Sequence, residues 1–165
     1  MREPSESTPQ TPDQTPDQAP DQRLVELCEQ LEHGLAAGIG VGHSLGIHLA
    51  DITAGRCVWT LTPSPAAANA MYIVHGGVIA TLMDTAMGSA VYSAIPPGAL
   101  YTTLELKVNF IRSVKLDGPL LRCEAETVHV GRRTATAQAR VVDDGGALVA
   151  HGTCTCLVFP PESAG

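Results

Sequence analysis

Charged residues are scarce in the middle of this chain. Between Arg56 and Glu105 the only charged residue is Asp84, and the rest of that stretch is apolar, small or neutral and polar. An ionised carboxylate in such surroundings is costly unless it is paired or hydrogen-bonded, so a lone one is often retained for chemistry. Asp84 is therefore the first candidate for a catalytic residue. The alternative is that Asp84 lies on the solvated side of an amphipathic helix.

Other absences narrow the class of protein. The chain has no uncharged apolar run of about 18 residues that could cross a membrane, and no GxSxG motif that would place a nucleophilic serine. The cysteines are odd in number and lack metal-site spacing, which favours free thiols in a reducing cytoplasm and no metal or redox cofactor. The five are Cys28, Cys57, Cys123, Cys154 and Cys156. Cys154 and Cys156 are two residues apart on an expected strand, so their side chains should face the same way.

The first 22 residues differ from the rest. Residues 11–22 read TPDQ-TPDQ-APDQ, and apart from Met1 the whole segment lacks large apolar side chains as well as the apolar core of a signal peptide. We therefore expect a disordered tail over residues 1–22 and one domain over 23–165. The tail carries a net charge of −4 and leaves −3 for the domain, which makes a nucleic-acid partner a poor fit.

Hydrophobic spacing and turn residues predict the order of the elements. A helix over 23–37 is followed by a glycine-rich passage, a hairpin, a loop over 64–73, a second helix, and four strands. This order favours an α+β fold in which an antiparallel sheet wraps around the second helix. The expected strands cover 46–52, 57–62, 100–111, 120–130, 132–142 and 147–159, and the central helix covers about 76–93.

The central helix combines two features that suit catalysis. Its start at His75-Gly76-Gly77 offers backbone N–H groups to an oxyanion, because the first turn of a helix leaves its donors unpaired. Opposite its broad apolar stripe, a second face of small residues surrounds the carboxylate and should also be buried. That face consists of Gly77, Thr81, Asp84 and Gly88.

The expected strand over 100–111 alternates between large apolar and other residues. A regular strand directs alternate side chains to one face of a sheet. The apolar set predicted to share a face is Leu100, Thr102, Leu104, Leu106, Val108 and Phe110.

These motifs together resemble the hot-dog-fold acyl-CoA thioesterases of the phenylacetate-pathway (PaaI-like) type. Asn69 precedes the HGG segment by six residues, and Asp84 follows its His75 by nine. The closing stretch from Gly131 through the DDGG turn to the last strand is also similar. The resemblance covers about residues 40–159 and implies hydrolysis of an acyl-CoA thioester without a cofactor.

The resemblance also implies roles for individual residues. The Gly76 N–H would polarise the thioester carbonyl, and Asp84 would act as nucleophile or general base. Asn69 and His75 would shape the loop and orient the thioester or the water, although His75 could instead have a purely structural role. Thr103, with Thr102 beside it, would assist the water. Gly77, Arg132 and Arg133 would contact the substrate or its CoA phosphates; the two arginines could otherwise form a solvated face.

The oligomeric state follows from the helix geometry. Gly76 and Asp84 are eight residues apart, which places them roughly 12 Å apart along one helix axis. One thioester cannot contact both, so we expect a homodimer with shared sites as the minimal active unit. We also expect a homotetramer as the full assembly, but the helix geometry does not decide between dimer and tetramer. Two other functions remain open: a hydratase or dehydratase on the same fold, and a non-catalytic acyl-CoA-binding protein. The acyl group also remains open.

Overall fold

The computed structural model of the chain describes residues 22–161. The predicted tail therefore lies outside the described residues, apart from Gln22, which begins the first helix. The elements in chain order are α1 (Gln22–Ala36), α2 (Gly40–Leu45), β1 (Ile47–Thr53), β2 (Arg56–Leu61), the short 3-10 helix η1 (Pro65–Ala67), α3 (Gly76–Ala94), β3 (Leu100–Phe110), β4 (Leu121–Val130), β5 (Thr134–Val142) and β6 (Leu148–Phe159).

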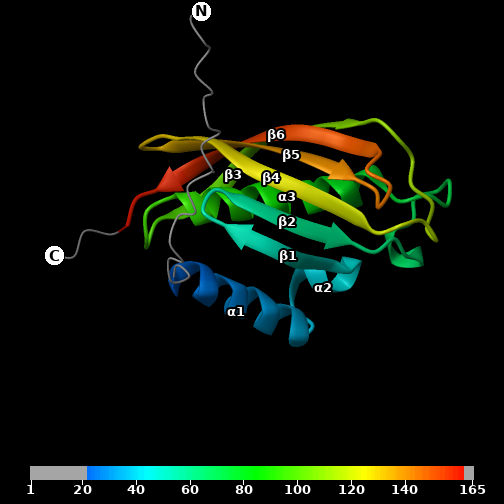
Figure 1. Cartoon of the computed structure of the whole chain (residues 1–165), viewed down its shortest axis with the longest axis horizontal. Coiled ribbons are helices and arrows are strands. Elements are labelled where there is room, and N and C mark those ends of the chain that lie inside the picture. The colour runs from blue at the N-terminus through cyan, green and yellow to red at the C-terminus, as the bar shows by residue number, and fades with distance from the viewer. Residues whose placement is uncertain (1–21, 162–165) are drawn as a thin grey trace, which may run out of the picture.

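The six strands form one antiparallel sheet in the order β1-β2-β4-β5-β6-β3. Figure 1 shows this sheet curving around α3, which runs along its inner side. The predicted α+β architecture, with a sheet wrapped around a central helix, is confirmed.

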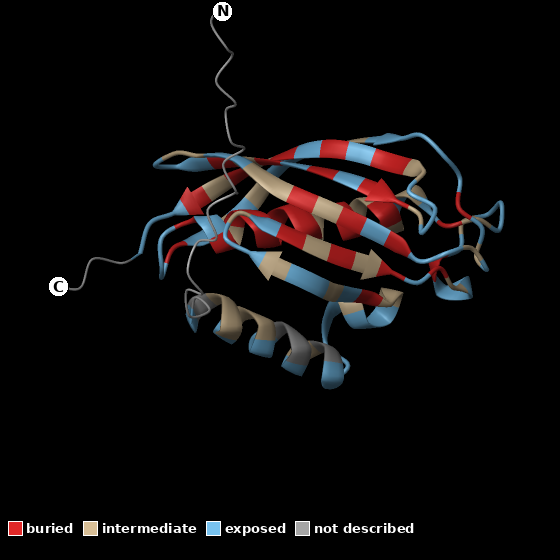
Figure 2. Ribbon diagram, in the orientation of Figure 1, coloured by how far each residue is buried: buried red, intermediate tan, exposed pale blue. Residues whose placement is uncertain are grey.

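The core lies between α3 and the inner face of the sheet. Leu82, Met83 and Met87 of α3 are fully buried, and Figure 2 shows the helix as the most enclosed element. The strands that face it present small side chains, so the helix axis can approach the sheet closely. These small inner residues are Ala125, Ala135, Ala137, Ala139, Ala150 and Gly152.

The alternation predicted for β3 is wrong because the strand contains a β-bulge. Thr103 pairs with Cys156 and Glu105 pairs with Thr155, so Leu104 has no partner in β6. A bulge adds one residue to a strand and exchanges the faces on either side of it. Leu104 is consequently 59% exposed, while Tyr101 and Thr103 point inward with Leu106 and Val108.

Two other boundaries differ from the sequence prediction. The glycine-rich passage before β1 contains the short helix α2, which ends at Gly46 in the left-handed conformation (φ 69°). Glycine adopts that conformation without strain and so ends helices efficiently. In addition, β5 begins at Thr134, which places Arg132 and Arg133 in the β4–β5 turn rather than in the strand.

The two edges of the sheet are unlike each other. At the β1 edge, α1 and α2 pack against the strand (Figure 1). The β3 edge has no neighbouring element among residues 22–161, and large apolar side chains are exposed along it and just beyond its end. They are Leu100, Leu104, Phe110 and Ile111, each more than half exposed. Within the described residues, no helix has the length and apolarity needed to cross a membrane.

Candidate active site

His75 forms the N-cap of α3. Its Nδ1 accepts a hydrogen bond from the Gly77 N–H at 2.8 Å, and its own N–H donates to the Ala67 carbonyl at 2.8 Å. An Nδ1 that accepts carries no proton, so the neutral ring bears its hydrogen on Nε2. The His75 ring is solvent-exposed, and no partner for Nε2 is found in the described part of the chain. His75 thus has a structural role and still presents one N–H donor.

Asn69 fixes the loop that leads to this helix. Its Oδ1 accepts from the N–H of Met71 at 2.9 Å and from the N–H of Ile73 at 3.3 Å. These bonds close a turn in which Tyr72 adopts a positive φ of 57°. The amide nitrogen of Asn69 makes no hydrogen bond within residues 22–161. Asn69 therefore shapes the loop with one end of its amide and leaves the other end available.

Gly76 is the first residue of α3, and its N–H has no acceptor within the chain segment described. A helix N-terminus carries partial positive charge, so this donor suits a developing oxyanion. The ring of Phe110 covers the glycine: a Cβ at position 76 would lie 3.2 Å from Phe110 Cζ. Phe110 was not among the predicted site residues, although the strand pattern places it on one face with Leu106 and Val108.

Asp84 lies two turns further along α3 and is half-buried. The hydroxyl of Thr103 donates to its Oδ1 at 2.9 Å, so β3 and α3 together hold the carboxylate. No partner for Oδ2 is found among the residues that the structure describes. A carboxylate with one oxygen oriented and the other free can accept a proton from water or attack a carbonyl carbon.

A second contact between β3 and α3 lies one helical turn beyond Asp84. A Cβ at Gly88 would lie 2.5 Å from the Tyr101 hydroxyl, so the tyrosine ring rests on the helix backbone at this glycine. Burial raises the pKa of Tyr101 to about 12, with smaller contributions from Cys156 and Asp84. Tyr101 was not among the predicted site residues.

Two cysteines lie behind Thr103. Cys156 pairs with Thr103 across the sheet, and its Sγ is 3.8 Å from that of Cys154. Both side chains are buried on the same side of β6, which confirms the prediction from their alternation. None of the five cysteines forms a disulfide.

The remaining predicted residues do not join this cluster within one chain. The N–H of Gly77 is occupied by His75, and a Cβ there would lie 3.0 Å from His75 Nδ1. Arg132 and Arg133 are exposed in the β4–β5 turn, at the end of the molecule opposite the loop that precedes α3 (Figure 1). Their proposed contacts with substrate therefore stay predictions.

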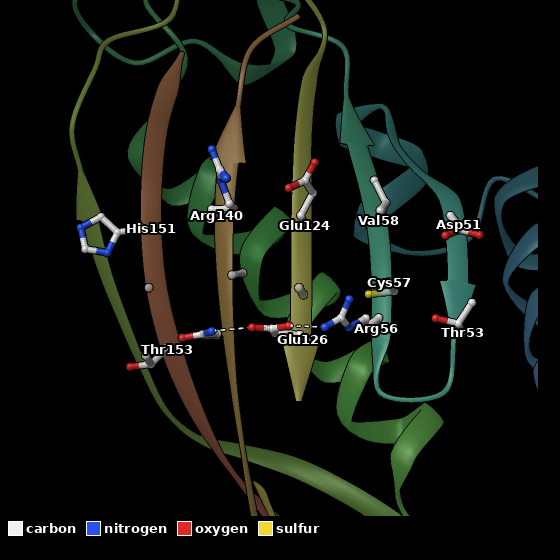
Figure 3. A pocket seen from close by; sticks show the side chains of 14 residues that line it. Asp51, Thr53, Arg56, Cys57, Val58, Glu124, Glu126, Arg140, His151 and Thr153 are labelled. Atoms are coloured by element: carbon white, nitrogen blue, oxygen red, sulfur yellow. Dashed lines mark hydrogen bonds and ion pairs between the residues drawn. The ribbon is translucent and has the colours of Figure 1, made fainter. Parts of the chain in front are cut away.

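A surface depression lies elsewhere. It measures about 730 Å³ and sits on the outer face of the sheet, across β1, β2, β4, β5 and β6. Figure 3 shows the exposed row across it, in which Arg56 pairs with Glu126 at 3.1 Å and Gln138 donates to Glu126 at 2.6 Å. None of the predicted site residues lines it.

Comparison with known sequences identifies the class of protein. Residues 71–150 match the thioesterase superfamily. The putative esterase ComA2 of Bacillus subtilis is 30% identical over 70% of this chain and 91% of its own length. The 1,4-dihydroxy-2-naphthoyl-CoA hydrolase of Listeria monocytogenes is 24% identical over 72% of this chain and 95% of its own.

Solved structures agree with this result. A conserved protein of Pseudomonas aeruginosa is 31% identical, with a TM-score of 0.68, over 73% of this chain and 95% of its own. A phenylacetic acid degradation protein PaaI of Thermus thermophilus is 26% identical, with a TM-score of 0.64, over 70% of this chain and 96% of its own. A hypothetical thioesterase of Streptococcus pneumoniae, solved with coenzyme A, is 26% identical, with a TM-score of 0.66, over 73% of this chain and 92% of its own.

The fold is that of a hot-dog thioesterase. This chain belongs to the thioesterase superfamily, with PaaI-type proteins among its relatives, and is a thioester hydrolase. The family resemblance drawn from Asn69, His75 and Asp84 is confirmed.

Proposed function

We propose that this protein hydrolyses an acyl-CoA thioester to a free acid and CoA, with Asp84 as the group that performs the chemistry. The observation that carries the proposal is the hydrogen bond from Thr103 to Asp84 Oδ1, which leaves Oδ2 free at the edge of an apolar core. In the reaction, a water oxygen forms a bond to the acyl carbon and the C–S bond breaks. The departing CoA thiolate takes up a proton.

Asp84 has two possible roles in this scheme. As a general base, Oδ2 takes a proton from the attacking water. As a nucleophile, Oδ2 attacks the acyl carbon itself, and water then hydrolyses the resulting anhydride. Single-turnover hydrolysis in water enriched with heavy oxygen can reveal the nucleophile, because water that opens the anhydride at the Asp84 carbonyl leaves its label in Asp84. Label only in the acid product is given by the general base and also by an anhydride opened at the acyl carbonyl, so trapping of the acyl-enzyme with hydroxylamine then decides between them.

The oxyanion site is assigned to the N-terminus of α3. The unpaired N–H of Gly76 would donate to the thioester oxygen, where negative charge develops. The free amide nitrogen of Asn69 and the Nε2–H of His75 point to supporting contacts with the thioester or the water. The Thr103 hydroxyl orients the carboxylate and so acts on the water through Asp84.

The two halves of the site would come from different subunits. Gly76 and Asp84 of one chain are separated by about 12 Å along α3, whereas reacting atoms must approach within about 3.5 Å. The free β3 edge, with Leu104 and Phe110 exposed, supports pairing of β3 with its counterpart in a second copy. With the two α3 helices antiparallel about the two-fold axis, each Gly76 faces the partner's carboxylate. Two such dimers would form the homotetramer.

The CoA moiety is inferred from chemistry and from relatives. One relative is named as a hydrolase of an aryl-CoA, and one structural neighbour holds coenzyme A. Arg132 and Arg133 are uncommitted to any ion pair in the described residues, and their guanidinium groups suit phosphates. The four buried cysteines of the core, none of them in a disulfide, support a reducing compartment, the cytoplasm.

A release assay over aryl- and aliphatic-acyl-CoAs tests the proposal. Wild-type protein should release free CoA thiol and acid. The Asp84→Asn variant should lose about 100-fold or more in kcat while still binding substrate, because the amide is neither base nor carboxylate nucleophile. A folded variant with near-normal turnover would remove Asp84 from the chemistry. Hydration of an enoyl-CoA without thiol release would instead support the hydratase alternative, and binding without any turnover would support the regulator.

A further inference from the structure

The Thr103 hydroxyl, which holds Asp84, has a second neighbour on the strand beside it. Thr103 and Cys156 are direct partners in the β3–β6 pairing, and both side chains point to the inner face of the sheet. Side chains at directly opposed positions of an antiparallel pair lie within contact distance. The Cys156 thiol forms a hydrogen bond with the Thr103 side chain, and Cys156 is completely buried.

The hydrogen of the thiol fills this contact. A threonine hydroxyl has a single hydrogen to donate, and that of Thr103 is directed to Asp84 Oδ1 at 2.9 Å. Towards Cys156 the Thr103 oxygen can therefore only accept, and the S–H of Cys156 is the donor. This contact fixes the direction of the hydroxyl, because a lone pair faces the sulfur while the hydrogen faces the carboxylate.

Cys154 provides the preceding link. Its Sγ lies 3.8 Å from that of Cys156, and Cys154 is buried as well. The hydrogen bond between the two thiols raises the pKa of Cys154 and lowers the pKa of Cys156, which is the pattern expected when Cys154 donates and Cys156 accepts. The hydrogen bonds of the two thiol groups therefore run in one direction, from β6 towards the carboxylate on α3.

We propose that Cys156 is a positioning residue for hydrolysis, whose S–H fixes the Thr103 hydroxyl in the orientation that holds Asp84 Oδ1 and leaves Oδ2 free. The inference rests on the proposed function, because it takes Asp84 as the reacting group. A group that accepts one hydrogen bond while donating another is polarised, and its donated bond is strengthened. Without the thiol, the bond from Thr103 to the carboxylate is weaker and less well directed.

The experiment measures thiol release from an acyl-CoA by variants of the relay. Cys156→Ala removes the donor and should lower kcat about 3- to 10-fold with KM little changed, as expected for a weak hydrogen bond. Cys156→Ser keeps a donor and should recover most of the rate. In a Thr103→Val background, Cys156→Ala should cause no further fall, because no hydroxyl remains to be oriented. The control is Cys123→Ala, an equally buried cysteine of β4, which should leave kcat unchanged.

The inference is overturned if Cys156→Ala lowers kcat as much in the Thr103→Val background as in the wild type, or no more than Cys123→Ala does. A second measurement does not depend on turnover. The infrared S–H stretching band of Cys156, assigned by its loss in Cys156→Ala, should move to higher frequency in Thr103→Val, because the thiol loses its acceptor. If the wild type hydrolyses no acyl-CoA, the proposed function fails; a shifted band would still support the donor role of Cys156, and an unshifted band would overturn it.

Discussion

The side chains of Thr103 and Asp84 join strand β3 to helix α3 through a 2.9 Å hydrogen bond at the only carboxylate of the helix. Thr103→Val keeps the branched shape and removes the donor. A hydrogen bond to a charged group contributes about 1.5–3 kcal/mol, so kcat should fall roughly 10- to 100-fold with KM little changed. Thr103→Ser retains the hydroxyl and should recover most of the rate. Equal activity of the Val and Ser variants, measured by thiol release, would show that the bond is structural only.

Shared active sites can be tested by mixing two inactive variants. One carries Asn69→Ala and His75→Ala, the other carries Asp84→Asn, and the two are unfolded and refolded together. In each mixed dimer one site receives both defects and the other is intact. Random pairing makes roughly half of the dimers mixed, so about a quarter of wild-type activity should return.

The control for this experiment refolds each variant alone. Neither should recover activity, because every site in a pure dimer keeps its defect. If all groups of a site came from one chain, the mixture would be as inactive as the pure variants.

The two arginines of the β4–β5 turn are predicted to contact CoA phosphates. Arg132→Ala with Arg133→Ala should raise KM for an acyl-CoA by about ten-fold, as expected for lost charge-assisted bonds. The effect should be small for the same acyl group on a short thiol that lacks the nucleotide. Arg56→Ala with Arg140→Ala, on the outer face of the sheet, removes the same charge and should change neither KM. Equal changes in KM for both thioesters would indicate that Arg132 and Arg133 do not contact the nucleotide part of CoA.

The buried phenol of Tyr101 makes stability depend on alkaline pH. Its pKa is raised from 10.0 to about 12 by burial, so the unfolded chain releases this proton first. Its contribution to stability is therefore complete below pH 10 and is lost as the pH rises towards 12. Denaturant titrations across this range should show a shallower loss of stability for Tyr101→Phe than for the wild type. Parallel curves would mean that Tyr101 ionises as freely in the folded protein as in the unfolded chain.

The sequence predicted the positions of residues correctly where the spacing of those residues along a single helix decides where they lie. The HGG segment begins α3 and Asp84 lies on the same helix, as predicted, because a helix fixes its residues at known intervals. The role of Thr103 came from the family resemblance, since regular alternation would have turned it away from Asp84. Tyr101 was missed for the same reason, whereas Phe110 keeps its predicted face and was missed because no local pattern shows that it covers Gly76. A bulge depends on pairing between distant strands, and no local pattern reports it.

The unpaired Leu104 has a consequence for how this protein can fail to fold correctly. Without the bulge, regular alternation up to Leu106 would direct Leu104 rather than Thr103 towards Asp84. That arrangement would bury the more apolar side of the strand, so it is a plausible competitor during refolding. The resulting protein would have every helix and strand in place and no hydroxyl beside its carboxylate. Spectroscopy of secondary structure would count such molecules as native, and only an active-site titration would separate them from working enzyme.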